Sequence, residues 1–195
     1  MTADQPPQLI LASQSIQRKE LLAAVGLNFS VVPAEIDERA IQHHSLGTRA
    51  QLVAAEKAKT VATQHPNACI VSADTFLVSG GVVLEKPSTS DHARQMLELQ
   101  SGSEVSAYTG CCVWLGGTFL FQDTAVTRCK LRPLSKAEID RYVTEQAVTT
   151  WAGGFTVAYL PGISFINQID GSYTGLLGLP LDLLLPVLKS IGYKW

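Results

Sequence analysis

Hydrophobic and polar residues follow alternating strand and helix patterns in the first third of the chain. Residues 9–12 form a continuous apolar run, as in a strand covered on both faces. Residues 16–26 have helical spacing, end in glycine and follow Ser15, a suitable N-cap. Residues 28–33 predict a second strand, and residues 48–64 predict a longer helix. This region therefore predicts strands and helices in alternation.

The rest of the chain predicts antiparallel strands with further helices. Two apolar segments flank Gly80 and Gly81, which predicts a β-hairpin, and two longer ones flank Gly116 and Gly117. These patterns favour a mixed α/β fold, and the absence of a repeat or linker predicts a single domain over residues 1–195. The remaining predicted elements are a helix that Ser90 caps and that ends at Leu99, a helix that begins with a capping box of Ser135 and Glu138, a strand over residues 163–169, and a closing helix that Pro186 kinks or breaks.

The composition excludes several classes of partner. The chain has 195 residues, of which 46% are hydrophobic and 16% charged, and its net charge is −2. This balance gives no general field for polymeric nucleic acid or an anionic membrane, so a polyanionic ligand would need individually placed cations. No apolar run approaches the roughly 20 residues that span a bilayer, and the N-terminus has no signal pattern. We therefore expect a cytoplasmic protein.

The four cysteines do not have the spacing of a metal site. Cys69, Cys111, Cys112 and Cys129 include no CxxC pair, and two neighbours on one strand would point to opposite faces. We interpret them as core thiols in a reducing compartment, in preference to a disulfide or metal set.

One carboxylate interrupts a strand that is otherwise mostly apolar. Asp74 lies within residues 71–78, and burying a carboxylate is unfavourable unless something neutralises or solvates it. The predicted hairpin would bring Lys86 back towards Asp74. Lys57 lies at the edge of the apolar stripe of its helix, where it either snorkels to solvent or points into a cleft. These side chains form a polar site, or else Asp74 caps a turn and the lysines are exposed.

A second polar segment joins the first strand to the first helix. Ser13 and Ser15 lie in this turn, next to a helix N-terminus and Arg18, an arrangement that can bind an anion. The turn lacks the glycines of a P-loop or a dinucleotide-binding fingerprint. Asp37 and Glu38 lie in a predicted loop, where solvated carboxylates are the common case.

Nine short motifs occur in the same order as in a known family. They read ASQSIQRKELL, IDE, EKAKTVA, SADT, LEKP, SG, YTG, AGGF and DGSYTGLLGLP, and they cover nearly the whole chain. Together they resemble the Maf (septum-formation) proteins. The resemblance implies a curved mixed sheet flanked by helices, with two lobes around a cleft, similar to the inosine triphosphatases.

The resemblance also implies an activity. Members of the family are nucleotide pyrophosphatases that use Mg²⁺ or Mn²⁺ to cleave a nucleoside triphosphate between the α and β phosphates, and they are typically homodimers. By position, Asp74 would be the catalytic carboxylate and would hold the metal together with Glu38. The substrate-binding residues that the resemblance implies are Ser13, Ser15, Arg18, Lys57 and Lys86.

Several pocket positions depart from the family pattern. A family arginine falls on Gln17, a glutamine on Ala158, a lysine on Trp151 and a histidine on Val105, whereas Thr75 matches the branch acting on dTTP and UTP. We treat Gln17, Thr75 and Ala158 as specificity positions and expect broad base tolerance. The alternative is a protein that has lost catalysis and binds nucleotides or a partner, and an unrelated α/β domain is a third possibility.

Overall fold

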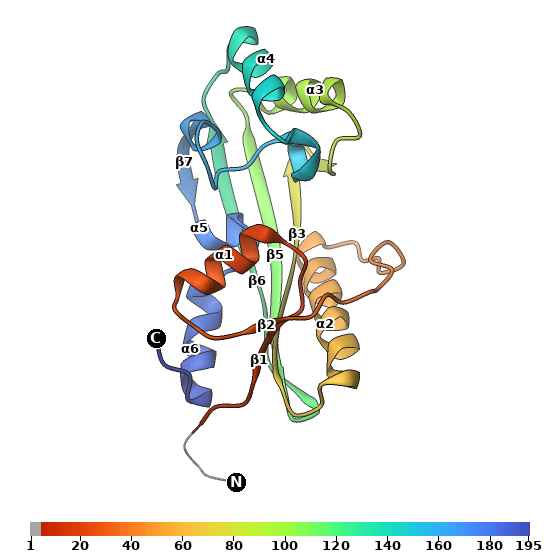
Figure 1. The fold of residues 1–195 in the computed structure, drawn as a ribbon. Helices are drawn as coiled ribbons and strands as arrows, with labels where there is room; N and C mark the ends of the chain where they lie inside the picture. Colours follow the sequence, from red (N-terminus) through yellow and green to blue (C-terminus); the bar gives the residue numbers. More distant parts are fainter. Residues whose placement is uncertain (1–4) are drawn as a thin grey trace. The chain divides into compact units, whose positions relative to one another are not determined.

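The computed structural model describes residues 5–195, and its strands form one mixed sheet (Figure 1). The strands are β1 (Leu9–Leu11), β2 (Ser30–Val31), β3 (Cys69–Ser79), β4 (Val82–Leu84), β5 (Glu104–Leu115), β6 (Thr118–Leu131) and β7 (Ile166–Asp170). Their order is β2-β1-β3-β5-β6-β7, and β4 pairs with β3. β1 is parallel to β2 and β3, whereas β4 and β7 are antiparallel to their neighbours β3 and β6. The predicted mixed α/β class is confirmed.

The helices begin largely where the polar residues predicted. Ser15, Ser45 and Ser135 each cap a helix by accepting a backbone hydrogen bond, and Glu138 completes the predicted capping box. The α-helices are α1 (Ile16–Ala24), α2 (Leu46–Gln64), α3 (Ser90–Gln100), α4 (Lys136–Glu145), α5 (Tyr173–Leu176) and α6 (Leu181–Ile191), and short 3₁₀ helices are η1 (Val148–Thr150), η2 (Ala152–Gly154) and η3 (Gly162–Phe165).

Several details differ from the sequence predictions. Helix α2 begins at Leu46 and not at residue 48, and β2 is shorter than the predicted strand over 28–33. Thr89 caps α3, not Ser90, because the Thr89 side chain accepts from the amide of His92. The first residues of the segment predicted as a strand from 163 fold as η3, so β7 begins at Ile166. Pro186 does not break α6, which continues through it with the proline exposed, where the loss of one helical hydrogen bond is tolerated.

The chain divides into two compact units. The first comprises the chain up to Thr75, Tyr108–Ala125 and Thr174–Trp195, and the second comprises Phe76–Ala107 and Val126–Tyr173. Strands β3, β5 and β6 contribute residues to both. The single domain over 1–195 and the cleft between lobes stay predictions.

Alternating side chains of β1 build two cores in the first unit. Leu9 and Leu11 pack with Leu22 of α1 and Leu188 of α6, whereas Ile10 packs on the other face against α2. Figure 1 shows α1 and α6 on one side of β1 and α2 on the other. Since both faces are covered, the continuous apolar run of β1 is explained.

Helix α2 packs directly against the backbone of β5 at Gly110. A Cβ atom at this position would overlap the backbone of Ala50 and Gln51 in α2, which cannot move aside as a flexible side chain can. The glycine therefore sets how closely α2 approaches the sheet.

We expect Gly110→Ala to lower the free energy of unfolding by about 2 kcal/mol, the usual scale of overpacking. Urea unfolding followed by circular dichroism measures the change. Gly47→Ala is the matched control, because its Cβ would meet only side-chain atoms, the nearest being Thr124 Cγ2 at 3.3 Å, and alanine favours a helix. Equal stabilities of the two variants would contradict the close approach of α2 and β5.

The second unit has its own helical packing. Helices α3 and α4 contact each other, and α3 also contacts η2. The fully buried Gln100 donates a hydrogen bond from Nε2 to the carbonyl oxygen of Gly153, 2.7 Å away. This hydrogen bond links η2, which contains Gly153, to α3.

All four cysteines are free and buried, which confirms the interpretation as core thiols. Burial raises the pKa of the Cys69, Cys112 and Cys129 thiols to about 11 and that of Cys111 to about 12. These thiols are therefore protonated at neutral pH and chemically inert. Among residues 5–195, the structure contains no helix with the length and apolarity to cross a membrane.

Candidate active site

Lys57 projects from the buried face of α2. Lys57 is only 7% exposed, which is unusual for a charged residue. The other residues of this buried face are apolar and include Val53, Ala54, Ala58 and Val61. The Lys57 ammonium nitrogen lies 2.8 Å from Asp74 Oδ1 and 2.7 Å from Glu38 Oε1. Of the two alternatives for Lys57, the structure therefore shows the inward one.

Asp74 lies in β3, at the end of a run of six buried residues. The carboxylate is also 7% exposed, so it has lost most of its hydration. Lys57 compensates that loss with a charge-assisted hydrogen bond. The Asp74 carboxylate, whose burial is unfavourable by itself, thus has a specific partner seventeen positions earlier in the chain.

Glu38 reaches Lys57 from the loop between β2 and α2. Its side chain is half-exposed, unlike that of Asp74. The neighbouring Asp37 has a different task, because its Oδ1 accepts from the amides of Arg39 and Ala40 and so shapes the loop. One ammonium therefore joins a buried and a half-exposed carboxylate.

Arg18 lies in the first turns of α1 and donates to several groups of the first unit. Its Nη1 donates to the Ala73 carbonyl at 2.7 Å and to Ser13 Oγ at 3.4 Å, and its Nη2 donates to Thr75 Oγ1 at 3.2 Å. Its Nε donates to the Gly178 carbonyl at 2.7 Å. Burial lowers the pKa of this guanidinium, and the Asp74 and Glu38 carboxylates oppose that shift.

The polar turn before α1 is also ordered by its own side chains. Ser13 is buried, and its Oγ accepts from the Ser15 amide at 3.2 Å. Ser15 Oγ in turn accepts from the Arg18 amide as the helix cap. Gln17 is half-buried in the first turn of α1. Anion binding at this turn stays a prediction.

Two of the predicted site residues belong to the second unit. Lys86 is exposed and lies two residues after the end of β4. Ala158 is half-buried, and its amide donates to Thr156 Oγ1 at 3.2 Å. Their assigned contacts with substrate stay predictions. The structure thus brings together Glu38, Lys57 and Asp74 and, beside them, Ser13, Arg18 and Thr75.

Sequence reasoning gave no role to three residues that contact this region. Thr109 lies 3.1 Å from Thr75 Oγ1 and donates to the Gly175 carbonyl, and Gly178 supplies the acceptor for Arg18 Nε. The YTG and GLP motifs that contain Thr109 and Gly178 were visible, but nothing local in them indicates which distant side chain they meet.

The carboxylates fit the donor preferences of Mg²⁺. Asp74 and Glu38 provide hard oxygen ligands, and Mg²⁺ in proteins commonly uses one or two carboxylates together with substrate phosphates. Within residues 5–195 there is no group of three or more His, Cys, Asp or Glu side chains placed to hold a metal. The donor set therefore suits an ion that is completed by phosphate and water and not a closed protein cage.

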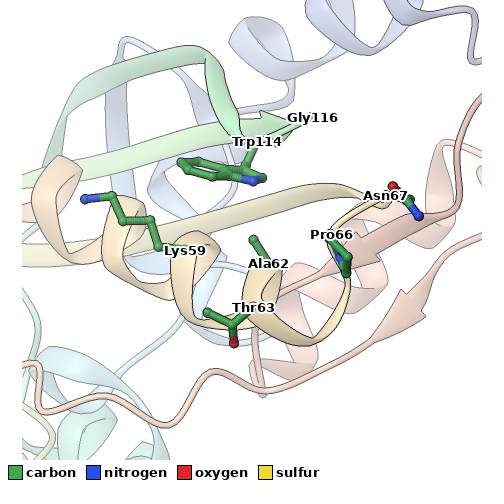
Figure 2. A pocket seen from close by; sticks show the side chains of 8 residues that line it. Lys59, Ala62, Thr63, Pro66, Asn67, Trp114 and Gly116 are labelled. Carbon is green, nitrogen blue, oxygen red and sulfur yellow. The ribbon is translucent and has the colours of Figure 1, made fainter.

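A separate open groove lies in the first unit (Figure 2). Its volume is about 600 Å³, and the residues that line it are Lys59, Ala62, Thr63, Pro66, Asn67, Trp114, Gly116 and Gly117. Trp114 packs edge-on against Phe119, with ring centroids 4.6 Å apart. These lining residues include none of the predicted site residues.

The fold and the cluster define a mixed α/β protein with an ion-paired carboxylate site in its first unit. The chain belongs to the family of Maf-like proteins, whose match spans residues 8–191. The family recognised in the sequence motifs is therefore confirmed.

Several curated relatives are similar over almost their whole length. A nucleoside triphosphate pyrophosphatase from Bradyrhizobium diazoefficiens is 38% identical over 188 residues, which cover 93% of both chains. A dTTP/UTP pyrophosphatase from Syntrophus aciditrophicus is 36% identical over 186 residues, covering 95% of this chain and 90% of that one. Another dTTP/UTP pyrophosphatase, from Anaeromyxobacter dehalogenans, is 35% identical over 190 residues, covering 96% and 95%.

Proposed function

We propose that the protein is a metal-dependent nucleoside triphosphate pyrophosphatase that releases a nucleoside monophosphate and pyrophosphate. The observation that carries the proposal is the buried Asp74 carboxylate, held by Lys57 next to Glu38. Membership of the Maf-like family and the names of the relatives support it. The names of two relatives, together with Thr75, favour dTTP and UTP among the substrates.

The residues have complementary tasks in this reaction. Asp74 orients a water molecule and accepts its proton while the water oxygen bonds to the α phosphorus, the anhydride bond to the β phosphate breaks, and pyrophosphate leaves with the bonding electrons. The Lys57 ammonium offsets negative charge that develops on the phosphate oxygens. Ser13, Ser15 and Lys86 would follow the polyphosphate, as the family resemblance implies, whereas Arg18, for which the resemblance implies the same, donates to the carbonyls of Ala73 and Gly178.

The charge of the cluster favours the participation of a divalent cation in the proposed reaction. The Glu38 and Asp74 carboxylates are balanced by Lys57 and Arg18, so the cluster has no surplus positive charge to offset a triphosphate. Mg²⁺ or Mn²⁺ held by Asp74 and Glu38 would supply a Lewis acid for the phosphate oxygens. Each carboxylate contacts Lys57 through one of its two oxygens, so binding the ion would not require either contact with Lys57 to break.

The proposal is tested by pyrophosphate release from standard and modified nucleoside triphosphates, with Mg²⁺, with Mn²⁺ and with EDTA. We expect pyrophosphate and monophosphate in equal amounts, with metal required and with activity on several bases. Orthophosphate in place of pyrophosphate would contradict the proposed bond cleavage. Nucleotide binding without turnover, with either metal, would establish the binding module considered as the alternative.

Cytoplasmic location and a homodimeric state remain part of the proposal. Four free buried thiols support a reducing compartment. The homodimer rests on the family resemblance.

A further inference from the structure

We propose that Arg18 and Thr109 are positioning residues that fix the backbone of β3 on both sides of Asp74. The guanidinium contacts Ala73 and Thr75, which flank the carboxylate residue in the chain. The effect on catalysis rests on the proposed function, because Asp74 is the proposed base. The expected effect on the backbone of β3 is independent of the proposed function.

The guanidinium is already bonded to protein acceptors along its edges. An arginine grips a phosphate through two parallel N–H groups of one edge. Here Nη1 and Nε each have a carbonyl partner at 2.7 Å, and Nη2 bonds to Thr75. These carbonyls belong to Ala73 and Gly178, and both would lose a charge-assisted partner if Arg18 turned to a phosphate. The observed contacts therefore favour holding the protein over holding the substrate.

The loop before α6 is shaped to receive this side chain. Gly178 has φ of +100°, a conformation that L side chains rarely adopt. A Cβ there would lie 3.2 Å from Arg18 Nε and 3.4 Å from Thr75 Oγ1. A glycine therefore gives the guanidinium room next to the carbonyl that it contacts.

Thr109 extends the contact to β5 and α5. It is fully buried, and its Oγ1 lies 2.8 Å from the Gly175 carbonyl oxygen and 3.1 Å from Thr75 Oγ1. A hydroxyl has one hydrogen and a carbonyl can only accept, so the Thr109 hydrogen goes to Gly175 and the Thr75 hydrogen goes to Thr109. Hydrogen bonds then run in one direction from Arg18 through both threonines to Gly175.

This chain of bonds fixes which way Thr75 presents its oxygen. Without the Thr109 hydroxyl, Thr75 would lose the acceptor that orients its own hydroxyl. The Gly175 carbonyl would keep the Gly178 amide as a donor but would lose its hydrogen bond to β5. Asp74 lies one residue away, and small displacements of a catalytic group in general strongly reduce turnover. We therefore expect Thr109 to influence the proton-accepting step without touching substrate.

The test compares Thr109→Val, which has a similar shape without the hydroxyl, with Thr109→Ser, which keeps it. For Thr109→Val we expect kcat to fall about tenfold with KM changed by less than about twofold, because the loss is one of geometry and not of binding. We expect Thr109→Ser to recover most of kcat. Wild-type kcat in Thr109→Val, or no recovery in Thr109→Ser, would overturn the proposal.

Arg18→Lys separates positioning from phosphate binding, since lysine keeps the charge but not the planar set of donors. We expect a lower kcat with the inhibition constant for pyrophosphate unchanged. A raised KM and weaker pyrophosphate inhibition with wild-type kcat would assign Arg18 to the phosphates instead. If Thr109→Val does not fold, Arg18→Lys decides the question by the same measurements.

Amide hydrogen exchange of residues 71–75 gives a readout that does not depend on activity. We expect faster exchange in Thr109→Val and Arg18→Lys than in the wild type, and wild-type exchange in Thr109→Ser. If the wild type releases no pyrophosphate, the proposed function fails while the exchange comparison still tests the positioning role. Unchanged exchange in both variants would overturn it.

Discussion

Asp74→Asn is expected to reduce pyrophosphate release by about 10²-fold or more, the scale of a removed general base. Asparagine is almost isosteric with aspartate, so the packing of β3 should hold. An amide, however, cannot accept the proton of the attacking water and is a poor ligand for Mg²⁺. The loss should appear mainly in kcat, measured by single-substrate kinetics with saturating metal.

Asp37→Asn is the matched control for this variant. Asp37 is exposed in the loop that carries Glu38, and the asparagine side chain can still accept from the amides of Arg39 and Ala40. We expect wild-type turnover within about twofold, because the substitution is exposed and keeps the acceptor that shapes the loop. If Asp74→Asn kept the turnover of this control, Asp74 would not be the base.

Lys57→Met is expected to lower the free energy of unfolding by about 3 kcal/mol, because removing one partner of a buried pair leaves the other charge uncompensated. Methionine keeps the apolar stem of the lysine, so the change isolates the ammonium. Asp74 is 7% exposed and cannot recover its hydration, whereas the half-exposed Glu38 can turn to solvent. Chemical unfolding in urea measures the difference.

Two further variants give this prediction its control. Lys59→Met removes a lysine from the exposed side of the same helix, where it lies 4.0 Å from the half-exposed Glu56 and 5.6 Å from the centroid of the Phe119 ring. We therefore expect a loss of about 1 kcal/mol at most. Adding Asp74→Asn to Lys57→Met removes the uncompensated charge and should restore much of the stability. A double variant as unstable as the sum of the single ones would show that Lys57 and Asp74 are not coupled.

Much of the fold was predictable because its signals are local. The apolar run of β1, the spacing of α2 and the caps at Ser15 and Ser135 depend on neighbouring residues. Boundaries were less predictable where two local choices compete, as for the cap of α3, where Thr89 and not Ser90 bonds to the helix. The central site was also partly predictable, because Asp74 and Lys57 each break an apolar pattern and so require a partner.

Sequence by itself determined which side chains would be costly to bury and, through the ordered motifs, the family. It identified Asp74, Lys57, Glu38 and Arg18 as candidates. The tertiary structure decided how these charges are paired: Lys57 joins the two carboxylates, while Arg18 donates to carbonyls of β3 and the loop before α6. The physical reason is that a lysine or arginine side chain donates hydrogen bonds to the acceptors that lie within about 3 Å of it. Strand pairing and helix packing bring those acceptors there from distant segments of the chain. The local sequence pattern around each charged residue therefore does not predict its partners.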